Sequence, residues 1–425
     1  MPKRLLLLLL TLVLCNALAL SQAKPSAQTA QHTGVALDSK RLARLDRALR
    51  EYIDKNQLVG IVALVLQDGR PVYERALGWS DKESGRKMTT DTIFRIASQT
   101  KAITSAAILI LMEEGKLSLD DPVGRFIPTF SRTKVAVKKD SGVELVSAKR
   151  QITIRDLLTH TAGISYGTQP TVSALYSAEG LGPAAGFGWY TADKDEPVGV
   201  TMERLGTLPF VAQPGESFVY GYNTDILGVV VEKASGIPLD QFIREHITQP
   251  LGMKATQFFL PPTERDRLAT LYSSGNDGLA VRAPEGAKGQ GHYVDGPRKS
   301  FAGGAGLLST ARDYARFLEM TRNGGILDGV RIMAPRTVML MQTNQSGMLH
   351  SQTGLGFGYG FQTTDRYGAN GMDGVGAYGW GGAYGTTYRV DPQARLTLVL
   401  MIQQLPNRTD IASKFPVMVY QALIN

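Results

Sequence analysis

One apolar stretch, residues 102–112, limits what kind of protein this sequence can form. It reads Ala-Ile-Thr-Ser-Ala-Ala-Ile-Leu-Ile-Leu-Met, so nearly every position is apolar or small. A helix that is apolar on all faces is usually buried inside a sizeable protein. The chain has 425 residues, which is enough for one large domain or two lobes around a substantial core. The stretch therefore predicts a buried helix that runs to about Glu114.

Ser98 and Lys101 stand at the start of this predicted helix. Residues three apart share one face of a helix, so the lysine amine is expected within reach of the serine hydroxyl. A serine hydroxyl attacks well only when a nearby base takes its proton. A lysine can be that base when burial or a neighbouring cation lowers its pKa. Because the helix dipole also favours negative charge at its N-terminus, the pair predicts a serine nucleophile.

The spacing Ser-x-x-Lys is a weak signal by itself, since about one or two matches are expected by chance in a chain of this length. The sequence holds four, beginning at Ser21, Ser84, Ser98 and Ser131. The first lies in the N-terminal segment and the second in a polar turn, while the last leads into a basic run. Only Ser98 opens an apolar helix, which favours it over the others.

Residues 1–23 have the pattern of a secretory signal peptide. A short basic end precedes the apolar core, residues 5–14, and small residues follow, with cleavage expected after Ala19 or Ala23. Cleavage would remove Cys15, the only cysteine of the chain, and with it any disulfide or thiolate metal site. We therefore expect a periplasmic or secreted protein without a stable membrane anchor after cleavage.

The charge pattern does not indicate a nucleic-acid-binding protein. The formal net charge is +8 at pH 7, which is modest for this size, and the basic residues are scattered. We expect the densest basic cluster, residues 134–150, to be a solvated loop. No metal and no cofactor are predicted, because the five histidines lack metal-ligand spacing: His32, His160, His246, His292 and His350. The expected partner is a small-molecule substrate, and the sequence carries no signal of oligomeric state.

Apolar periodicity predicts an α+β fold with helical and strand-forming regions at both ends of the chain. Helices are expected at 38–56, 310–320 and 415–423, and strands at 61–66, 71–77, 386–390 and 396–403. The middle of the chain shows short helices and long loops rich in glycine and proline. We therefore expect a flexible leader at residues 24–37. An α/β lobe is expected from residues 38–116 and 300–425, and an inserted, mostly helical lobe from residues 117–299.

Two further segments carry groups that suit acyl transfer. Tyr220 and Tyr222 lie in a loop before a predicted helix. A tyrosine near Lys101 would have its phenolate favoured by the positive charge, and it could then take the serine proton. Residues 379–385, Gly-Trp-Gly-Gly-Ala-Tyr-Gly, precede a predicted strand, and an exposed N–H there could serve an oxyanion hole. Taken alone, these segments are better explained by a packed tyrosine and by a tight turn.

Together these motifs resemble the penicillin-recognising serine hydrolases of the class C β-lactamase and family VIII carboxylesterase type. Ser98 with Lys101 matches the family's first motif, Tyr220 the second, and Trp380 with the two glycines after it the third. Connecting segments agree as well, at 157–163, 250–256 and 303–310. The resemblance runs from about residue 42 to residue 403. It implies a three-layer α/β/α fold with a central antiparallel sheet, and an acyl-enzyme mechanism.

The resemblance also implies roles for individual residues. Ser98 would be the acylated nucleophile and Lys101 with Tyr220 the proton-handling pair, while the backbone N–H groups of Ser98 and Ala383 would form the oxyanion hole. Four residues are expected to contact substrate: Tyr222, Trp380, Gly381 and Gly382.

Two departures from the family pattern bear on function. The β-lactamases have asparagine two residues after the motif tyrosine, whereas here Tyr222 stands there and Asn223 follows, so that Tyr222 rivals Tyr220 as the base. The third motif normally carries a lysine that helps to bind a substrate carboxylate, and Trp380 replaces it. A site without that cation should prefer neutral, apolar acyl groups, because burying an unpaired carboxylate is costly. Relatives with Trp-Gly-Gly are typically esterases.

The sequence therefore favours a carboxylesterase and leaves two alternatives open. The first is a β-lactamase or D-alanyl-D-alanine peptidase on the same fold, with Arg389 as a substitute carboxylate anchor. The second is a catalytically inactive binding protein. Gly163-Ile-Ser165-Tyr-Gly167 matches the nucleophile elbow of other hydrolases, but that motif needs a preceding strand, and here a helix precedes it. We interpret it as a helix-terminating turn.

Overall fold

The computed structural model describes residues 37–181, 193–286 and 289–424. The predicted signal peptide and nearly all of the predicted leader lie outside the described residues. Three aromatic residues whose loop composition suits the lining of an acyl pocket, Phe187, Trp189 and Tyr190, also lie outside the described residues. The described residues belong to one compact unit.

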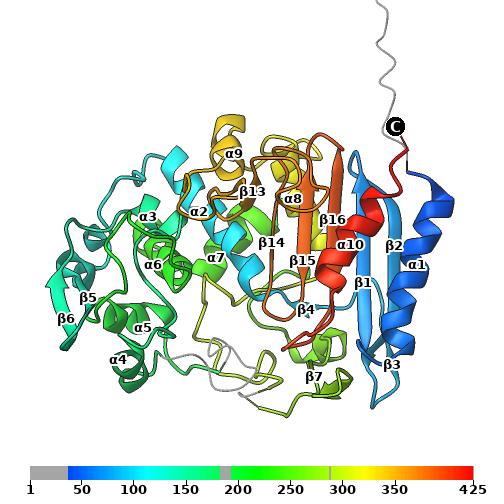
Figure 1. Cartoon of the computed structure of the whole chain (residues 1–425), viewed down its shortest axis with the longest axis horizontal. Coiled ribbons are helices and arrows are strands. Elements are labelled where there is room, and N and C mark those ends of the chain that lie inside the picture. The colour runs from blue at the N-terminus through cyan, green and yellow to red at the C-terminus, as the bar shows by residue number, and fades with distance from the viewer. Residues whose placement is uncertain (1–36, 182–192, 287–288, 425) are drawn as a thin grey trace, which may run out of the picture. The chain divides into compact units, whose positions relative to one another are not determined.

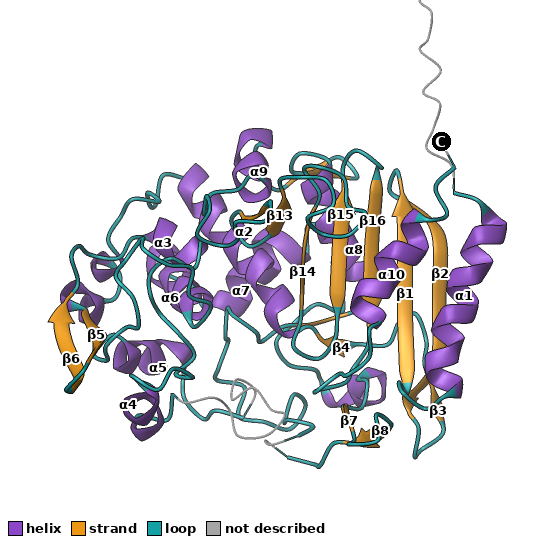
Figure 2. Cartoon of the chain, viewed as in Figure 1, coloured by secondary structure: helices purple, strands orange, loops and turns teal. Residues whose placement is uncertain are grey.

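An eight-stranded antiparallel sheet forms the centre of the fold (Figures 1 and 2). Its order is β12-β13-β14-β15-β16-β1-β2-β3. The strands are β1 Gly60–Gln67, β2 Arg70–Asp81, β3 Arg86–Lys87, β12 Leu355–Phe357, β13 Gln362–Thr364, β14 Tyr378–Gly381, β15 Thr387–Asp391 and β16 Leu396–Met401. Because β16 pairs with β1, the two ends of the chain together build one sheet.

The sheet is buried on both faces, which explains why its central strands are continuous apolar runs. Successive residues of a strand point to opposite faces. In β1, Val62 and Leu64 belong to the core under α2 Thr100–Glu113 and α8 Ala311–Arg322. Ile61 and Ala63 belong to a second core under α1 Ser39–Asp54 and α10 Ile411–Tyr420. Helices thus cover both faces (Figure 1), and the predicted three-layer α+β fold is confirmed.

Helices and short hairpins fill the sequence between β4 and β9, two short strands that pair with each other. The bounds are β4 Phe94–Arg95, β5 Lys134–Lys139, β6 Gly142–Ser147, α3 Ile154–Leu158, α4 Ser173–Ala178, α5 Val198–Leu205, α6 Asn223–Ser235, α7 Leu239–Ile243, β7 Tyr272–Ser274, β8 Ala280–Arg282 and β9 Leu308–Ser309. After α8 come β10 Ile326–Leu327, β11 Val330–Arg331 and α9 Pro335–Gln342. In the part of the chain that is described, no helix combines the length and the apolar character needed to cross a bilayer.

The basic cluster at 134–150 is largely a β-hairpin, so the prediction of a solvated loop was wrong. Strands β5 and β6 pair along their whole length. Ala136 N–H also donates to the carbonyl of Phe210 at 2.8 Å, and Phe210 N–H donates to Lys134 at 2.8 Å. Val135 and Ala136 are buried, whereas the lysines around them are exposed. The many lysines of this segment suggested full exposure, but β5 contains two buried residues and is hydrogen-bonded to Phe210.

Candidate active site

Ser98 lies in a 3₁₀ turn, Ala97–Gln99, that leads into α2. The predicted buried helix is confirmed: every residue from Thr100 to Leu111 is buried. Ala97 has a φ of 43°, a left-handed conformation that is uncommon for a residue with a side chain. Such strain persists only where the surroundings hold it, and Ala97 is fully buried beside Leu271 and Tyr384. The fold therefore fixes the backbone immediately before Ser98.

The ammonium of Lys101 makes three hydrogen bonds in a buried site. It donates to Ser98 Oγ at 3.3 Å, to the Tyr166 hydroxyl at 3.0 Å and to the Gly304 carbonyl at 2.7 Å. An ammonium has three donors, so this environment satisfies all of them. Lys101 is 1 % exposed and Ser98 is 7 % exposed. The serine hydroxyl is thus held against a desolvated cation at the edge of the core.

Asp225 is linked to Lys101 through the backbone of Gly304. Gly304 N–H donates to Asp225 Oδ1 at 3.0 Å, while its carbonyl accepts from Lys101. A Cβ at position 304 would lie 2.4 Å from Asp225 Oδ2, so only glycine allows this approach. Burial raises the pKa of Asp225 to about 6, against the opposing effect of the Lys101 charge. Neither Asp225 nor this contact was predicted from the sequence, although 303–310 was among the matching segments.

Tyr220 and Tyr166 both lie beside the Lys101 ammonium and contact each other. The Lys101 ammonium is 4.7 Å from the ring centroid of Tyr220 and 5.7 Å from that of Tyr166. The two tyrosine rings meet edge to face at 5.8 Å. Burial raises the pKa of Tyr166 well above its usual value, so Tyr166 is a neutral phenol at neutral pH. No motif in the sequence indicated the contact of Tyr166 with Lys101.

Trp380 and His160 hold Tyr220 from two sides. Trp380 Nε1–H donates to the Tyr220 hydroxyl at 3.2 Å, and the His160 ring lies 4.7 Å from the Tyr220 ring. Burial, with a contribution from the Lys101 charge, lowers the pKa of His160 well below its usual value, so the imidazole is neutral. Asn223 Nδ2–H donates to His160 Nδ1 at 3.0 Å. Asn223 thus fixes the His160 ring, which packs against the ring of Tyr220.

The turn that carries Ala383 lies against the chain just before the serine. Gly382 N–H donates to the Thr386 carbonyl at 2.7 Å and closes the turn. A Cβ at Gly382 would lie 2.3 Å from the Ile96 carbonyl, so the absence of a side chain permits the close approach. Gly381 and Gly382 are partly exposed beside Trp380. These residues and the Ser98 turn therefore share one edge of the site.

The family model described as Beta-lactamase matches residues 45–422. The chain belongs to the beta-lactamase family. It is 34 % identical over 394 residues to esterase EstB of Burkholderia gladioli, covering 88 % of this chain and 94 % of that protein. It is 28 % identical over 430 residues to a protein of Escherichia coli (strain K12) provisionally named a D-alanyl-D-alanine carboxypeptidase, covering 94 % and 90 % of the two chains.

Among solved structures, the fold is similar to that of EstCE1, described as a hydrolase with promiscuous acyltransferase activity. The TM-score is 0.73 at 27 % sequence identity, and the match covers 90 % of this chain and 98 % of that one. The predicted membership of the penicillin-recognising serine hydrolases is confirmed. The protein is a serine hydrolase of this family, and such a fold acts on small-molecule substrates.

Two residues lie where their predicted roles do not fit. Tyr222 is 1 % exposed, and its hydroxyl donates to the Leu181 carbonyl at 2.8 Å. That buried position does not suit a substrate contact, and it favours Tyr220 as the base. Arg389 lies opposite Gly379 in the neighbouring strand, and its guanidinium forms an ion pair with Asp373 at 2.9 Å. This ion pair lies on one face of the sheet, whereas the Tyr388 ring lies in the main core on the other face. Since Trp380 shares the Tyr388 face, Arg389 cannot anchor a carboxylate beside Trp380.

The second serine motif proves to be structural. Ser165 is fully buried, and its hydroxyl accepts from the Gly167 N–H at 3.0 Å. Gly163 has a φ of 83° shortly after the end of α3, and a Cβ there would lie 2.1 Å from the Ala212 carbonyl. The segment is an irregular loop and does not terminate the helix as predicted, because α3 already ends at Leu158 and the left-handed residue that follows it is His160. Among the described residues, no cluster of acidic, histidine or cysteine side chains could hold a metal ion.

Proposed function

We propose that the protein hydrolyses carboxylic esters through an acyl-enzyme on Ser98. The observation that carries this proposal is the buried contact between Lys101 and Ser98, with Tyr220 beside the same ammonium. A nucleophile needs a positioned base, and a cation beside a phenol favours its ionised form. The name of the relative esterase EstB and the description of EstCE1 as a hydrolase support the same chemistry.

In this mechanism Ser98 Oγ attacks the ester carbonyl carbon while its proton passes to the Tyr220 oxygen. The tetrahedral oxyanion would accept hydrogen bonds from the N–H groups of Ser98 and Ala383, the pair that the family resemblance implies. When the C–O bond breaks, the proton passes from Tyr220 to the leaving alcohol. Water then attacks the acyl carbon, Tyr220 takes a proton from that water, and Ser98 Oγ leaves with the proton returned. Lys101, which contacts both Ser98 Oγ and the Tyr220 ring, stabilises the negative charge that develops on the Tyr220 oxygen.

The aromatic residues around Trp380 support a neutral acyl or alkoxy group as substrate. Trp380 lies 5.3 Å from Phe357 and 6.4 Å from His350, and Phe357 lies 5.3 Å from Phe218. Burial lowers the pKa of His350, so this histidine is neutral as well. A substrate carboxylate placed against these rings would lose its hydration without gaining a cation. Neutral esters bring no such penalty.

The two alternatives receive different support. A D-alanyl-D-alanine peptidase or β-lactamase fits the name of the Escherichia coli relative. Such an activity needs a cation for the substrate carboxylate, and Arg389 is engaged by Asp373 on the other face of the sheet. An inactive binding protein is disfavoured because Lys101 contacts both Ser98 Oγ and the ring of Tyr220 in a buried site.

Paired kinetics on p-nitrophenyl butyrate and nitrocefin would test the proposal, with Ser98→Ala as the control. We expect ester turnover that falls by at least about 10³-fold in Ser98→Ala, together with slow nitrocefin cleavage. Fast nitrocefin cleavage would replace the esterase by a β-lactamase. If the purified protein turns over neither substrate, and an activated phosphonate does not label Ser98, then the binding protein becomes the better account.

We also propose that the protein is exported to the periplasm or beyond the cell. This proposal is supported by the sequence of residues 1–23 alone. Fractionation of expressing cells, followed by N-terminal sequencing of the mature protein, would test it. A protein that keeps Met1 and stays in the cytoplasm would contradict it.

A further inference from the structure

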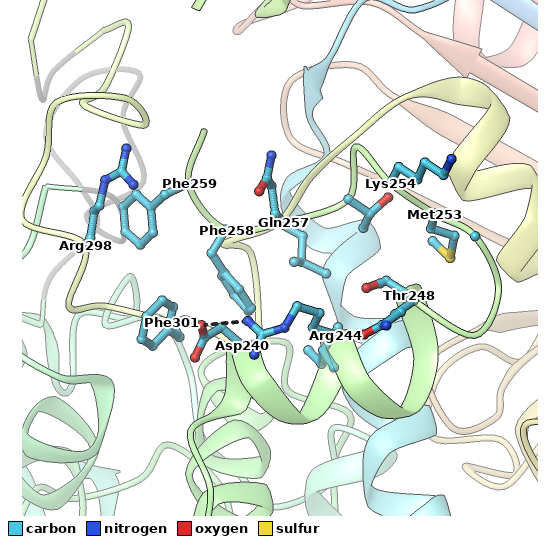
Figure 3. Close-up of a pocket in the computed structure, with 15 residues that line it drawn as sticks. Asp240, Arg244, Thr248, Met253, Lys254, Gln257, Phe258, Phe259, Arg298 and Phe301 are labelled. Carbon is cyan, nitrogen blue, oxygen red and sulfur yellow. Dashed lines mark ion pairs between the residues drawn. The ribbon is translucent and has the colours of Figure 1, made fainter. Parts of the chain in front are cut away.

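The short strand β4, which ends three residues before Ser98, is held along both of its edges. One edge pairs with β9, and the far edge of β9 is bonded in turn to the backbone of Gln257 (Figure 3). In an antiparallel pair, every second residue points its backbone groups away from the partner strand. Leu308 directs its N–H and carbonyl to Gln257, and Arg95 lies opposite Leu308. The backbone groups of Arg95 therefore point away from β9.

The side-chain amide of Gln403 takes the place of a strand beside Arg95. Its Oε1 accepts a hydrogen bond from Arg95 N–H at 2.8 Å, and its Nε2–H donates to the Arg95 carbonyl at 3.4 Å. An amide carries both an acceptor and donors, so it can bond the two backbone groups of one residue as a neighbouring strand would. Gln403 is buried, two residues after the end of β16. The central sheet thus reaches the segment before the nucleophile through one side chain.

The Arg95 side chain ties the same point to two further loops. Its guanidinium is buried, and it donates from Nη1 to the Ala269 carbonyl at 2.7 Å and from Nε to the Gln290 carbonyl at 3.0 Å. Nη1 also lies 3.4 Å from Gln403 Oε1. A buried charged group is stable only when hydrogen bonds replace those it made to water. Backbone carbonyls and one amide do so here, which fixes Arg95 from its side chain as well as from its backbone.

The residue after Gln403 holds the turn that carries Ala383. Gln404 N–H donates to the Tyr384 carbonyl at 2.9 Å. Tyr384 and Ala97 belong to one small buried cluster, and Ala383 packs against that cluster. Neighbouring residues of one segment therefore bond both turns that supply N–H groups to the oxyanion hole of the proposed mechanism.

We propose that Gln403 is a positioning residue for acyl transfer, because it fixes the backbone of Arg95 and thereby the turn at Ser98. The turn contains Ala97 in a left-handed conformation, and strain of this kind persists only where the surroundings hold it. Release of Arg95 would let the turn relax and move the Ser98 N–H relative to that of Ala383. A displacement of about 1 Å can cost roughly 10²-fold in rate. This inference rests on the proposed acyl-enzyme mechanism.

Matched substitutions of two glutamines would test this role. Gln403→Met keeps the length of the side chain and removes both bonds to Arg95. With p-nitrophenyl butyrate, it should lower kcat roughly tenfold or more and change KM little, because substrate still binds and the oxyanion is stabilised less. The control Gln342→Met removes an amide in α9 that bonds the Thr321 carbonyl and the Tyr378 hydroxyl. Its kcat should stay within about threefold of wild type.

Urea denaturation would establish that each variant is folded under the conditions of the assay. A contact that only stabilises the fold leaves the kcat of the folded molecules unchanged, so the split between kcat and KM distinguishes positioning from stability. If Gln403→Met does not fold, Gln403→Asn replaces it: this side chain stays polar but is one methylene too short to reach Arg95, and it should show the same loss.

Four outcomes would overturn the inference at Gln403. They are a wild-type kcat in a folded Gln403 variant, an equal loss of kcat in Gln342→Met, a loss confined to KM, and failure of both Gln403 variants to fold. Wild type and Ser98→Ala in the same assay separate these outcomes from a failure of the proposed function. Without Ser98-dependent turnover by wild type, the proposed function fails and this inference with it. With such turnover, only the role of Gln403 is decided.

Discussion

The buried carboxylate of Asp225 leads to a prediction about stability and pH. Burial raises its pKa from the ordinary 3.8 to about 6. Between these pH values the folded protein holds a proton on Asp225 that the unfolded chain has released. The free energy of unfolding therefore falls as pH rises from about 4 to about 6, and it remains low above that range. A difference of about two pKa units corresponds to about 3 kcal/mol.

Asp225→Asn should remove this dependence. The asparagine oxygen can still accept the hydrogen bond from Gly304 N–H, and the side chain no longer titrates. Near pH 4 the variant and wild type should have similar free energies of unfolding. At pH 8 the variant should be more stable by up to about 3 kcal/mol. Urea denaturation at several pH values between 4 and 8 would measure both curves.

Asp140→Asn provides the matched control, because Asp140 is exposed beside the β5–β6 turn. This change should leave the shape of the pH dependence as it is in wild type. The reasoning about Asp225 would be refuted if wild type and Asp225→Asn lost stability in parallel between pH 4 and pH 6. It would also be refuted if Asp225→Asn were the less stable protein at pH 8.

Three further predictions concern the neighbours of Ser98. Tyr166→Phe should lower kcat for esters roughly tenfold or more, because Lys101 loses a hydrogen-bond partner. Tyr222→Phe should leave kcat nearly unchanged and destabilise the fold by about 1 kcal/mol, because only the bond to the Leu181 carbonyl is lost. The opposite ranking of the two variants in kinetics and thermal unfolding would make Tyr222 the functional residue. Trp380→Phe keeps an aromatic ring but removes the N–H that donates to the Tyr220 hydroxyl. The kcat for esters should therefore fall roughly tenfold while KM changes little. An unchanged kcat would show that this hydrogen bond has no catalytic role. Gly382→Ala should abolish most ester hydrolysis, because the new Cβ would collide with the Ile96 carbonyl. A fully active variant would show that the 382–386 turn does not form part of the oxyanion hole.

Local patterns in the sequence predicted the parts of this protein that depend on local geometry. The apolar residues 102–112 required a buried helix, and α2 is that helix. The strands expected at 61–66 and 396–403 are β1 and β16, and the structure shows that both are buried on both faces. Ser98 and Lys101 lie close together because three residues of helical chain separate them. For these features, position in the sequence sets position in space.

Other features were decided only when distant segments packed together. Tyr166 and Gly304 reach Lys101 from 65 and 203 residues away, so no spacing along the chain could identify them. In the same way, the two motif tyrosines differ by only two positions, yet one lies beside Lys101 and the other bonds the Leu181 carbonyl. The direction of a loop side chain depends on what packs around the loop, and that is a property of the whole fold.

The register of the sheet explains why Arg389 is not the predicted carboxylate anchor. Arg389 and Tyr388 are adjacent in β15, but strand geometry sends neighbouring side chains to opposite faces. Tyr388 joins the core on the Trp380 side, and Arg389 pairs with Asp373 on the other. The sequence determined which chemical groups this protein possesses and which of them are neighbours along a helix or a strand. Which groups meet across the fold was decided by tertiary structure, because packing and register bring together residues that the chain itself keeps far apart.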